Sequence, residues 1–216
     1  EVAPNPRNSS IAEVHIAFTE PVVGFDLGDL TLTRDGGANV LAAGMPLTSQ
    51  DGIVWTLAGL AGLTATTGGY ELSILPAAGI TDLAGNPLAG VAVRTWAVDT
   101  ALPTASIVAV SPDPHRAAVP SITITFSEAV SGLTLDDLAL TRSGSGNLLT
   151  GSECLSTSDG VTWILSGLGA TTGASGDYEL TLSAAGGNVV DAAGNPLVGD
   201  AVESWTTDSV LPIVHD

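Results

Sequence analysis

The chain contains no lysine. Its five basic residues are all arginines, against 23 acidic residues, and the formal net charge is −18 at pH 7. A nucleic-acid-binding protein needs a basic patch to contact phosphates, so this composition excludes that class. An anionic membrane surface would also repel the chain. The partners that suit such a charge are cations, with calcium first because it prefers hard oxygen ligands.

Cysteine and long apolar runs are equally scarce. Cys154 is the single cysteine, which excludes an intrachain disulfide. Its neighbours alternate within an apolar run, so we expect it to be a buried small hydrophobic residue. No apolar run approaches the roughly 20 residues of a membrane-spanning helix. We therefore expect no membrane insertion.

The chain also lacks the groups that catalysis requires. Its three histidines are His15, His115 and His215. None of them is placed as the base that a serine or cysteine nucleophile needs. Zinc-binding spacings and phosphate-binding loops are absent too. We expect a protein that is not an enzyme.

What the chain does contain is an internal repeat. The segment Val14–Val22 returns 108 residues later as Ile122–Val130, and Asp82–Leu88 returns 109 residues later as Asp191–Leu197. A period of this length matches a whole small domain rather than a solenoid unit. The repeat predicts domains over residues 1–100 and 101–208. Residues 209–216 would form a linker or the start of a following strand.

Each copy has the pattern of short strands separated by tight turns. Ile122, Ile124 and Phe126 alternate with threonines, which is typical of a half-buried strand. Asp-Gly pairs at 51–52 and 159–160 are hairpin signals. About seven such strands per ~100 residues indicate an immunoglobulin-like sandwich. The predicted fold class is therefore all-β, with two tandem immunoglobulin-like β-sandwich domains.

The same alignment predicts which aromatic residues lie where. Tyr70 and Tyr178 stand at the start of a late strand, where a tyrosine corner is expected. Other large side chains are expected between the sheets of each domain. These are Phe18, Trp55 and Leu72, with their counterparts Phe126, Trp163 and Leu180.

Three motifs carry a family resemblance. Phe-Thr/Ser-Glu, then Asp-x-Ala-Gly-Asn-x-Leu, then Trp followed by Asp and Pro occur in both copies. In these motifs the chain resembles the bacterial Ig-like repeats of large cell-surface adhesins and S-layer-type proteins. The resemblance implies an extracellular stalk or filament module, often stiffened by calcium and without catalysis. It departs from isopeptide-crosslinked pilin domains, because that crosslink requires a lysine.

The turns and the linker suggest where a cation would bind. In an immunoglobulin-like topology, Glu128 and Asp191 should lie at the end of the second domain that receives the linker residue Asp99. Carboxylates that converge there would suit Ca²⁺. The segment with Asp136 and Asp137 is expected at the same end. Alternatively, Asp191 only caps its own turn. The repeat predicts an equivalent site from Glu20, Asp82 and the Asp208 of a neighbouring molecule.

Three functions fit these features. Two are structural or adhesive extracellular roles, either as a rod segment of a long surface stalk or as the subunit of a filament. The partners would be neighbouring copies of the same domain or protein, and no receptor or glycan is indicated. The third is a carbohydrate-binding module, which requires an exposed aromatic platform. Trp96 and Trp205 are the candidates for it, and their burial would exclude this function.

The two ends of the repeat suggest a head-to-tail contact. Leu102–Val110 has the pattern of a first strand for the second copy. The first copy starts at Glu1, which corresponds to Ala109, so most of its equivalent strand is missing. Residues 209–216 of one molecule could complete the first domain of the next. The alternative is that the chain was cut from a longer array at an arbitrary phase.

Overall fold

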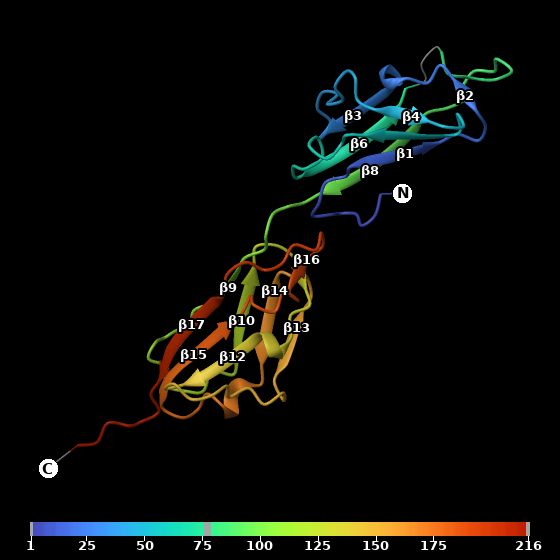
Figure 1. Ribbon diagram of the computed structural model, residues 1–216. Coiled ribbons are helices and arrows are strands. Elements are labelled where there is room, and N and C mark those ends of the chain that lie inside the picture. Colours follow the sequence, from blue (N-terminus) through green and yellow to red (C-terminus); the bar gives the residue numbers. More distant parts are fainter. Residues whose placement is uncertain (1, 76–78, 215–216) are drawn as a thin grey trace. The chain divides into compact units, whose positions relative to one another are not determined.

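The computed structural model describes residues 2–75 and 79–214, and almost all of its regular structure is β-strand (Figure 1). The chain divides into two compact units, unit 1 (Glu1–Ala101) and unit 2 (Leu102–Asp216). Every pair of strands within the sheets is antiparallel. The all-β fold expected from the sequence is confirmed.

Unit 1 consists of two three-stranded sheets and a short ribbon. One sheet has the order β1 (Glu13–Ala17), β5 (Val54–Ala58) and β4 (Leu47–Ser49). The other has the order β3 (Leu30–Arg34), β6 (Gly68–Ile74) and β8 (Ala92–Val98). The ribbon pairs β2 (Val22–Val23) with β7 (Thr81–Asp82), and a 3-10 turn, η1 (Leu27–Asp29), precedes β3.

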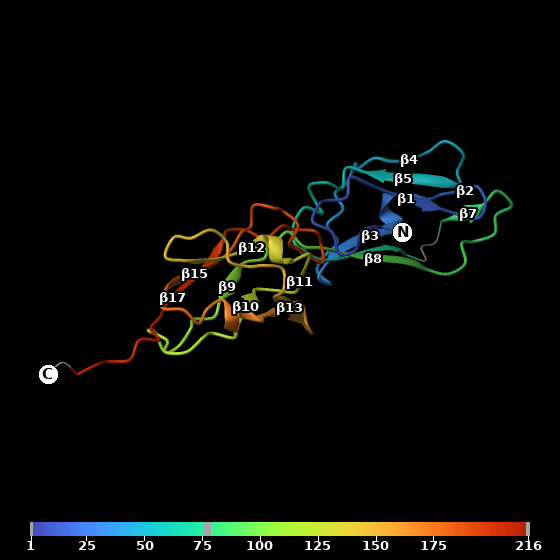
Figure 2. The same ribbon diagram turned by 90° about the horizontal axis from the view of Figure 1, so that it is seen from below.

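Unit 2 repeats this arrangement and adds one strand. Its larger sheet has the order β13 (Cys154–Thr157), β14 (Thr162–Ser166), β10 (Ser121–Phe126) and β9 (Ala105–Ile107). The facing sheet contains β12 (Leu138–Arg142), β15 (Gly176–Leu182) and β17 (Ala201–Thr207). The ribbon pairs β11 (Val130–Ser131) with β16 (Val190–Asp191), and the 3-10 turns are η2 (Leu135–Asp137) and η3 (Leu168–Ala170). Figure 2 shows the strands of each unit from a second direction.

Period-2 alternation explains the core of each unit. Leu30 and Leu32 of β3 are 1% and 0% exposed, and the threonines between and after them are half-buried. Successive side chains of a strand point to opposite faces, so the leucines lie between the sheets. The hairpin turns follow from their Asp-Gly pairs. Asp51 Oδ1 accepts the backbone N–H groups of Ile53 and Val54, and Gly52 has a positive φ of 71°.

A tyrosine corner is present in both units, as the sequence predicts. The Tyr70 hydroxyl donates to the carbonyl of Thr66 at 2.7 Å, and the Tyr178 hydroxyl donates to the carbonyl of Ala174 at 2.8 Å. Each tyrosine ring also stacks on a tryptophan of the neighbouring strand. Tyr70 and Trp96 have centroids 5.6 Å apart, and Tyr178 and Trp205 have centroids 5.4 Å apart.

Two expectations about burial are wrong. Trp55 and Trp163 are only half-buried, because each lies beside a hairpin turn, and their indole N–H groups donate to the carbonyls of Gly52 and Gly160. Phe18 is half-buried as well, and packs edge-on against Phe25. The tryptophans that fill the cores are instead those stacked on the tyrosines.

Cys154 is exposed rather than buried. It stands on β13, which pairs only with β14 among the described residues. The alternation of this strand turns Leu155 toward the core and Cys154 to the opposite face. None of the helical segments in residues 2–75 and 79–214 has the length and hydropathy that a membrane crossing requires.

Candidate cation site

The Asp191–Asn195 turn holds one carboxylate in a fixed position. Asp191 Oδ1 accepts the backbone N–H groups of Ala193 and Asn195, both at 2.8 Å. Its Oδ2 accepts the side-chain amide of Asn195, also at 2.8 Å. The residue is 5% exposed. Asp191 therefore does cap its own turn, which was one of the two roles expected for it.

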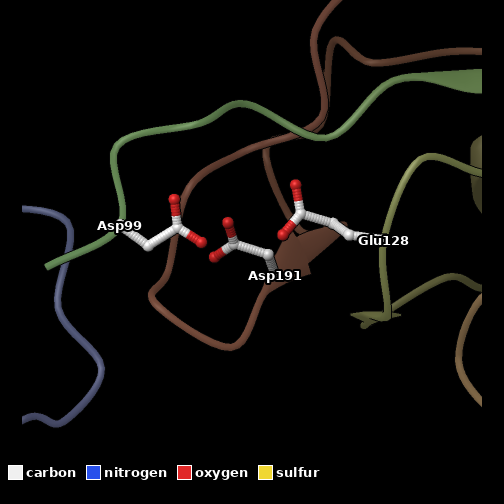
Figure 3. Close-up of side chains that lie close together, drawn as sticks. All are labelled: Asp99, Glu128 and Asp191. Carbon is white, nitrogen blue, oxygen red and sulfur yellow. The ribbon is translucent and has the colours of Figure 1, made fainter. Parts of the chain in front are cut away.

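The same aspartate also belongs to a group of three carboxylates. Asp99, Glu128 and Asp191 each place one carboxylate oxygen within 4.8 Å of the other two. Figure 3 shows the three side chains directed toward one another. These are the three residues that the sequence predicts for one cation site.

The fold explains how residues far apart in sequence meet here. β11 pairs with β16 so that Val130 stands opposite Asp191. Glu128 lies two residues before Val130, in the turn between β10 and β11. Asp99 comes directly after β8, and its Oδ1 accepts the backbone N–H of Ala101 at 3.0 Å.

The donor set fits a hard divalent cation. Calcium binds six to eight oxygen ligands, largely carboxylates and carbonyls. A structural zinc site uses cysteine or histidine ligands, and this group has neither. Three carboxylates at this separation also repel one another, and a bound Ca²⁺ would offset that repulsion. The three residues would supply monodentate or bidentate oxygen ligands, with others coming from water or backbone.

The remaining predicted ligands do not form a group of three within the described part of the chain. Glu20 is exposed. Asp82 is held by its own turn, and the side-chain amide of Asn86 lowers the pKa of Asp82 together with the backbone N–H groups of the turn. Asp208 is exposed and accepts the backbone N–H of Val210 at 3.0 Å. The equivalent site was predicted to need a second molecule, so it stays a prediction.

The segment around Asp137 has a local role. Asp137 Oδ2 accepts the backbone N–H of Thr134 at 2.8 Å and its hydroxyl at 3.0 Å. The side chain thus caps the 3-10 turn η2. Asp29 does the same for η1 by accepting the backbone N–H of Asp26. Asp136 and Asp137 are not part of the group of three carboxylates.

The two tryptophans that were candidates for carbohydrate binding are buried. Trp96 and Trp205 are each 2% exposed and lie in the two cores. A sugar ring can stack only on an aromatic face that it can reach. The condition set for this function is therefore not met, and the carbohydrate-binding hypothesis on these two residues is wrong.

Comparison with solved structures shows distant likeness. A titin I-band fragment, I67–I69, is 14% identical over 94% of this chain, with a TM-score of 0.36. The chain spans 60% of the length of that fragment. Murine CEACAM1b is 15% identical, with a TM-score of 0.30, over 94% of this chain and 95% of its own. A comparison with curated proteins found no match.

The class and the family follow from the fold and from a sequence comparison. Paired antiparallel sheets with a tyrosine corner define each unit as an immunoglobulin-like β-sandwich. Residues 99–208, just over half of the chain, match the family described as bacterial Ig-like domain. The chain belongs to this family. The matched residues include all three carboxylates of the candidate cation site.

Proposed function

We propose that the chain is a non-catalytic structural or adhesive module of a bacterial extracellular surface protein. The observation that carries this proposal is the family match over residues 99–208, together with the recurrence of the same motifs and the same strand order in unit 1. Bacterial Ig-like domains are commonly extracellular. Tandem copies of one sandwich extend a chain, as repeat arrays do, and need no reaction centre for that role.

Two versions of this role are open to experiment. As a rod segment, the chain would be one stretch of a longer surface stalk. As a filament subunit, it would bind neighbouring copies head to tail. Electron microscopy of the purified chain distinguishes them, because filaments that grow with protein concentration would support the second version.

A bound calcium ion is the second part of the proposal. The support is the group formed by Asp99, Glu128 and Asp191, which brings three carboxylate oxygens together. A chain with a net charge of −18 also attracts cations in general. Calcium at this group would be a structural ion. It would stabilise the folded chain rather than take part in a reaction.

Surface labelling tests the cellular role. An antibody raised against the purified chain should label intact cells of the bacterium that produces it, as strongly as it labels permeabilised cells. Labelling that appears only after permeabilisation would contradict the extracellular role.

A further inference from the structure

Among the described residues, the outer face of the four-stranded sheet in unit 2 carries no charged side chain. This sheet contains β9, β10, β13 and β14, and alternate side chains of each strand point away from the core. The outward side chains of the four strands are serines and threonines, apart from Ile164 of β14 and Cys154 of β13. We call these outward residues the uncharged face.

The other outer sheet faces within residues 2–75 and 79–214 all carry acidic side chains. In unit 2, Asp177 and Glu179 are exposed on β15. In unit 1, Glu13 is exposed on β1, where its carboxylate lies 3.4 Å from the imidazole of His15, and Glu71 is exposed on β6. The uncharged face therefore stands apart in a chain with 23 acidic residues and a net charge of −18.

The strand register places two exposed apolar side chains in one row across this face. Ile164 of β14 stands opposite Thr123 of β10 on one side and opposite Ser156 of β13 on the other. Val108 follows β9, and its backbone N–H donates to the carbonyl of Thr123 at 2.8 Å. Ile164 is 43% exposed and Val108 is 52% exposed. Burial of these two side chains against a partner would favour association.

Unit 1 carries a different row at the aligned positions. The repeat offset of 108 aligns Thr56 with Ile164 and His15 with Thr123. Nδ1 of His15 lies 3.1 Å from Oγ1 of Thr56, which is a hydrogen-bonding distance. Because β1, β5 and β4 have the same order as β10, β14 and β13, the uncharged face follows from the side chains of unit 2 and not from the fold.

The distribution of charge favours a second copy as the partner of this face. A basic partner would gain more by binding one of the acidic faces. A partner as acidic as the chain itself meets like charges on those faces, and such contacts oppose binding. The uncharged face lets two acidic molecules approach without them. A second copy is such a partner, and a twofold axis brings the same face of each copy together.

We propose that the uncharged face binds the same face of a second copy of this chain, so that neighbouring copies associate side by side through a twofold contact. Two sheets pack face to face at a separation of about 10 Å when their side chains interdigitate. The proposal rests on the structural or adhesive role proposed above and names a partner surface for it. It applies to a rod segment and to a filament subunit alike.

The size of the face indicates a weak contact. Strands lie about 4.8 Å apart and rise about 3.3 Å per residue, so the four strands of this sheet cover roughly 300 Å². A stable complex buries about 800 Å² on each partner. The contact should therefore be transient in dilute solution. Copies held close together on one surface have a high effective concentration, at which a weak contact is sufficient.

Sedimentation of the full chain in the presence of a chelator tests the contact without bound calcium. We expect a monomer–dimer equilibrium with a dissociation constant on the order of 0.1–1 mM, as a small interface implies. Raising the salt concentration from about 0.1 M to about 1 M shortens the Debye length from about 10 Å to about 3 Å. It should strengthen the dimer, because it screens only the net repulsion between copies. Cys154→Ser should dimerise as the original chain does.

Two matched pairs of variants locate the contact. Ile164→Asp and Ser156→Asp each place a charge on the uncharged face and should weaken the dimer about tenfold or more. Thr56→Asp and Thr48→Asp make the same change at the aligned positions of unit 1 and should leave the dimer unchanged. Ile164 and Ser156 are both exposed, so their variants should melt close to the temperature of the original chain.

Three results would overturn the proposal. One is a chain that stays monomeric at millimolar concentration in high salt. Another is association that Ile164→Asp and Ser156→Asp leave intact, which would assign it to a different surface, such as a head-to-tail contact. The third is a dimer that Cys154→Ser abolishes, which would make the link a disulfide. Surface labelling of cells tests the extracellular role separately, so none of these results contradicts that role.

Discussion

The side chain of Asn195 donates to Asp191 Oδ2 at 2.8 Å, and the matching pair in unit 1, Asn86 and Asp82, is joined at 2.6 Å. The two turns are built alike but are not equally covered. Asp191 is 5% exposed, whereas Asp82 is half-buried. The same hydrogen bond is therefore shielded from water in unit 2 and less so in unit 1.

This difference predicts unequal effects of one substitution. Asn195→Ala leaves a nearly buried carboxylate without one of its donors, which should cost roughly 1.5–3 kcal/mol of the free energy of unfolding. Asn86→Ala should cost less, because water can replace the lost donor. Urea unfolding of both variants measures the difference. Equal losses would show that burial does not decide the strength of this turn.

Two tryptophan substitutions should differ in their effect on the free energy of unfolding, because one residue lies in a core and the other at the end of a sheet. Trp205→Ala removes a side chain that is 2% exposed and stacked on Tyr178, so it should cost roughly 3–5 kcal/mol. Trp163→Ala, half-buried beside its hairpin, should cost clearly less. Chemical denaturation of the two variants gives both values, and the reverse order would contradict the assignment of the cores.

Acid should destabilise the chain through its hairpin aspartates. Backbone N–H groups, that of Val54 first, lower the pKa of Asp51, and those of Thr162 and Val161 lower the pKa of Asp159. A carboxyl group with a lower pKa in the folded state stabilises the chain above its unfolded value, about 3.9. That contribution disappears as the pH falls through the folded value.

Melting temperatures measured from pH 6 downward test this. The double variant Asp51→Asn and Asp159→Asn should lose less stability between about pH 4 and pH 2 than the original chain. Because other carboxylates also titrate there, the comparison must be made between the two chains. If the melting temperatures of the two chains fell in parallel with pH, the hairpin aspartates would not be the source of the acid destabilisation.

Calcium should raise the melting temperature if the three carboxylates bind it. A ligand at 100 times its dissociation constant stabilises the folded state by about 2.7 kcal/mol. Calorimetry in calcium and in a chelator should therefore differ for the original chain. The difference should vanish in Glu128→Gln and persist in Glu179→Gln, an exposed residue of β15 outside the group. Identical melting curves in both buffers would count against a calcium site.

Gly132 lies so close to the backbone of Asn188 that a side chain at this position should be costly. Gly132 has φ of 86°, and a Cβ on it would lie 2.1 Å from the carbonyl oxygen of Asn188. Gly144 has φ of 77° and open space around it. Gly144→Ala should cost roughly 1–2 kcal/mol for the left-handed conformation alone. Gly132→Ala should cost more, since the backbone must also move. Thermal unfolding of the two variants isolates the effect of the contact.

Much of the fold could be predicted because local chemistry specifies it. The Asp-Gly hairpins, the alternating strands and both tyrosine corners need only neighbouring residues, and the repeat supplies each of them twice. Alternation also shows which side chains share a face. It does not show how near a side chain lies to the end of its sheet. For this reason Trp55 and Trp163 were expected in the core, although they lie at a rim.

The candidate cation site could likewise be predicted only in part. The grouping of Asp99, Glu128 and Asp191 was predicted from the usual connections of an immunoglobulin-like sandwich. The burial of Asp191 could not be predicted, because it depends on contacts with residues distant in the sequence. Cys154 shows where prediction from strand alternation fails. A shift of one residue in the assumed alternation moves a side chain from the core to the surface, and here the inward position belongs to Leu155.

The stacked pairs and the rim tryptophans have a practical consequence for spectroscopy. Each unit contains one indole sealed against a tyrosine, Trp96 or Trp205, and one that solvent can reach, Trp55 or Trp163. A collisional quencher such as acrylamide should extinguish the fluorescence of the second kind and spare that of the first. The intrinsic emission of this chain thus has two distinguishable components, and the loss of the protected component would report the opening of a core without any added label.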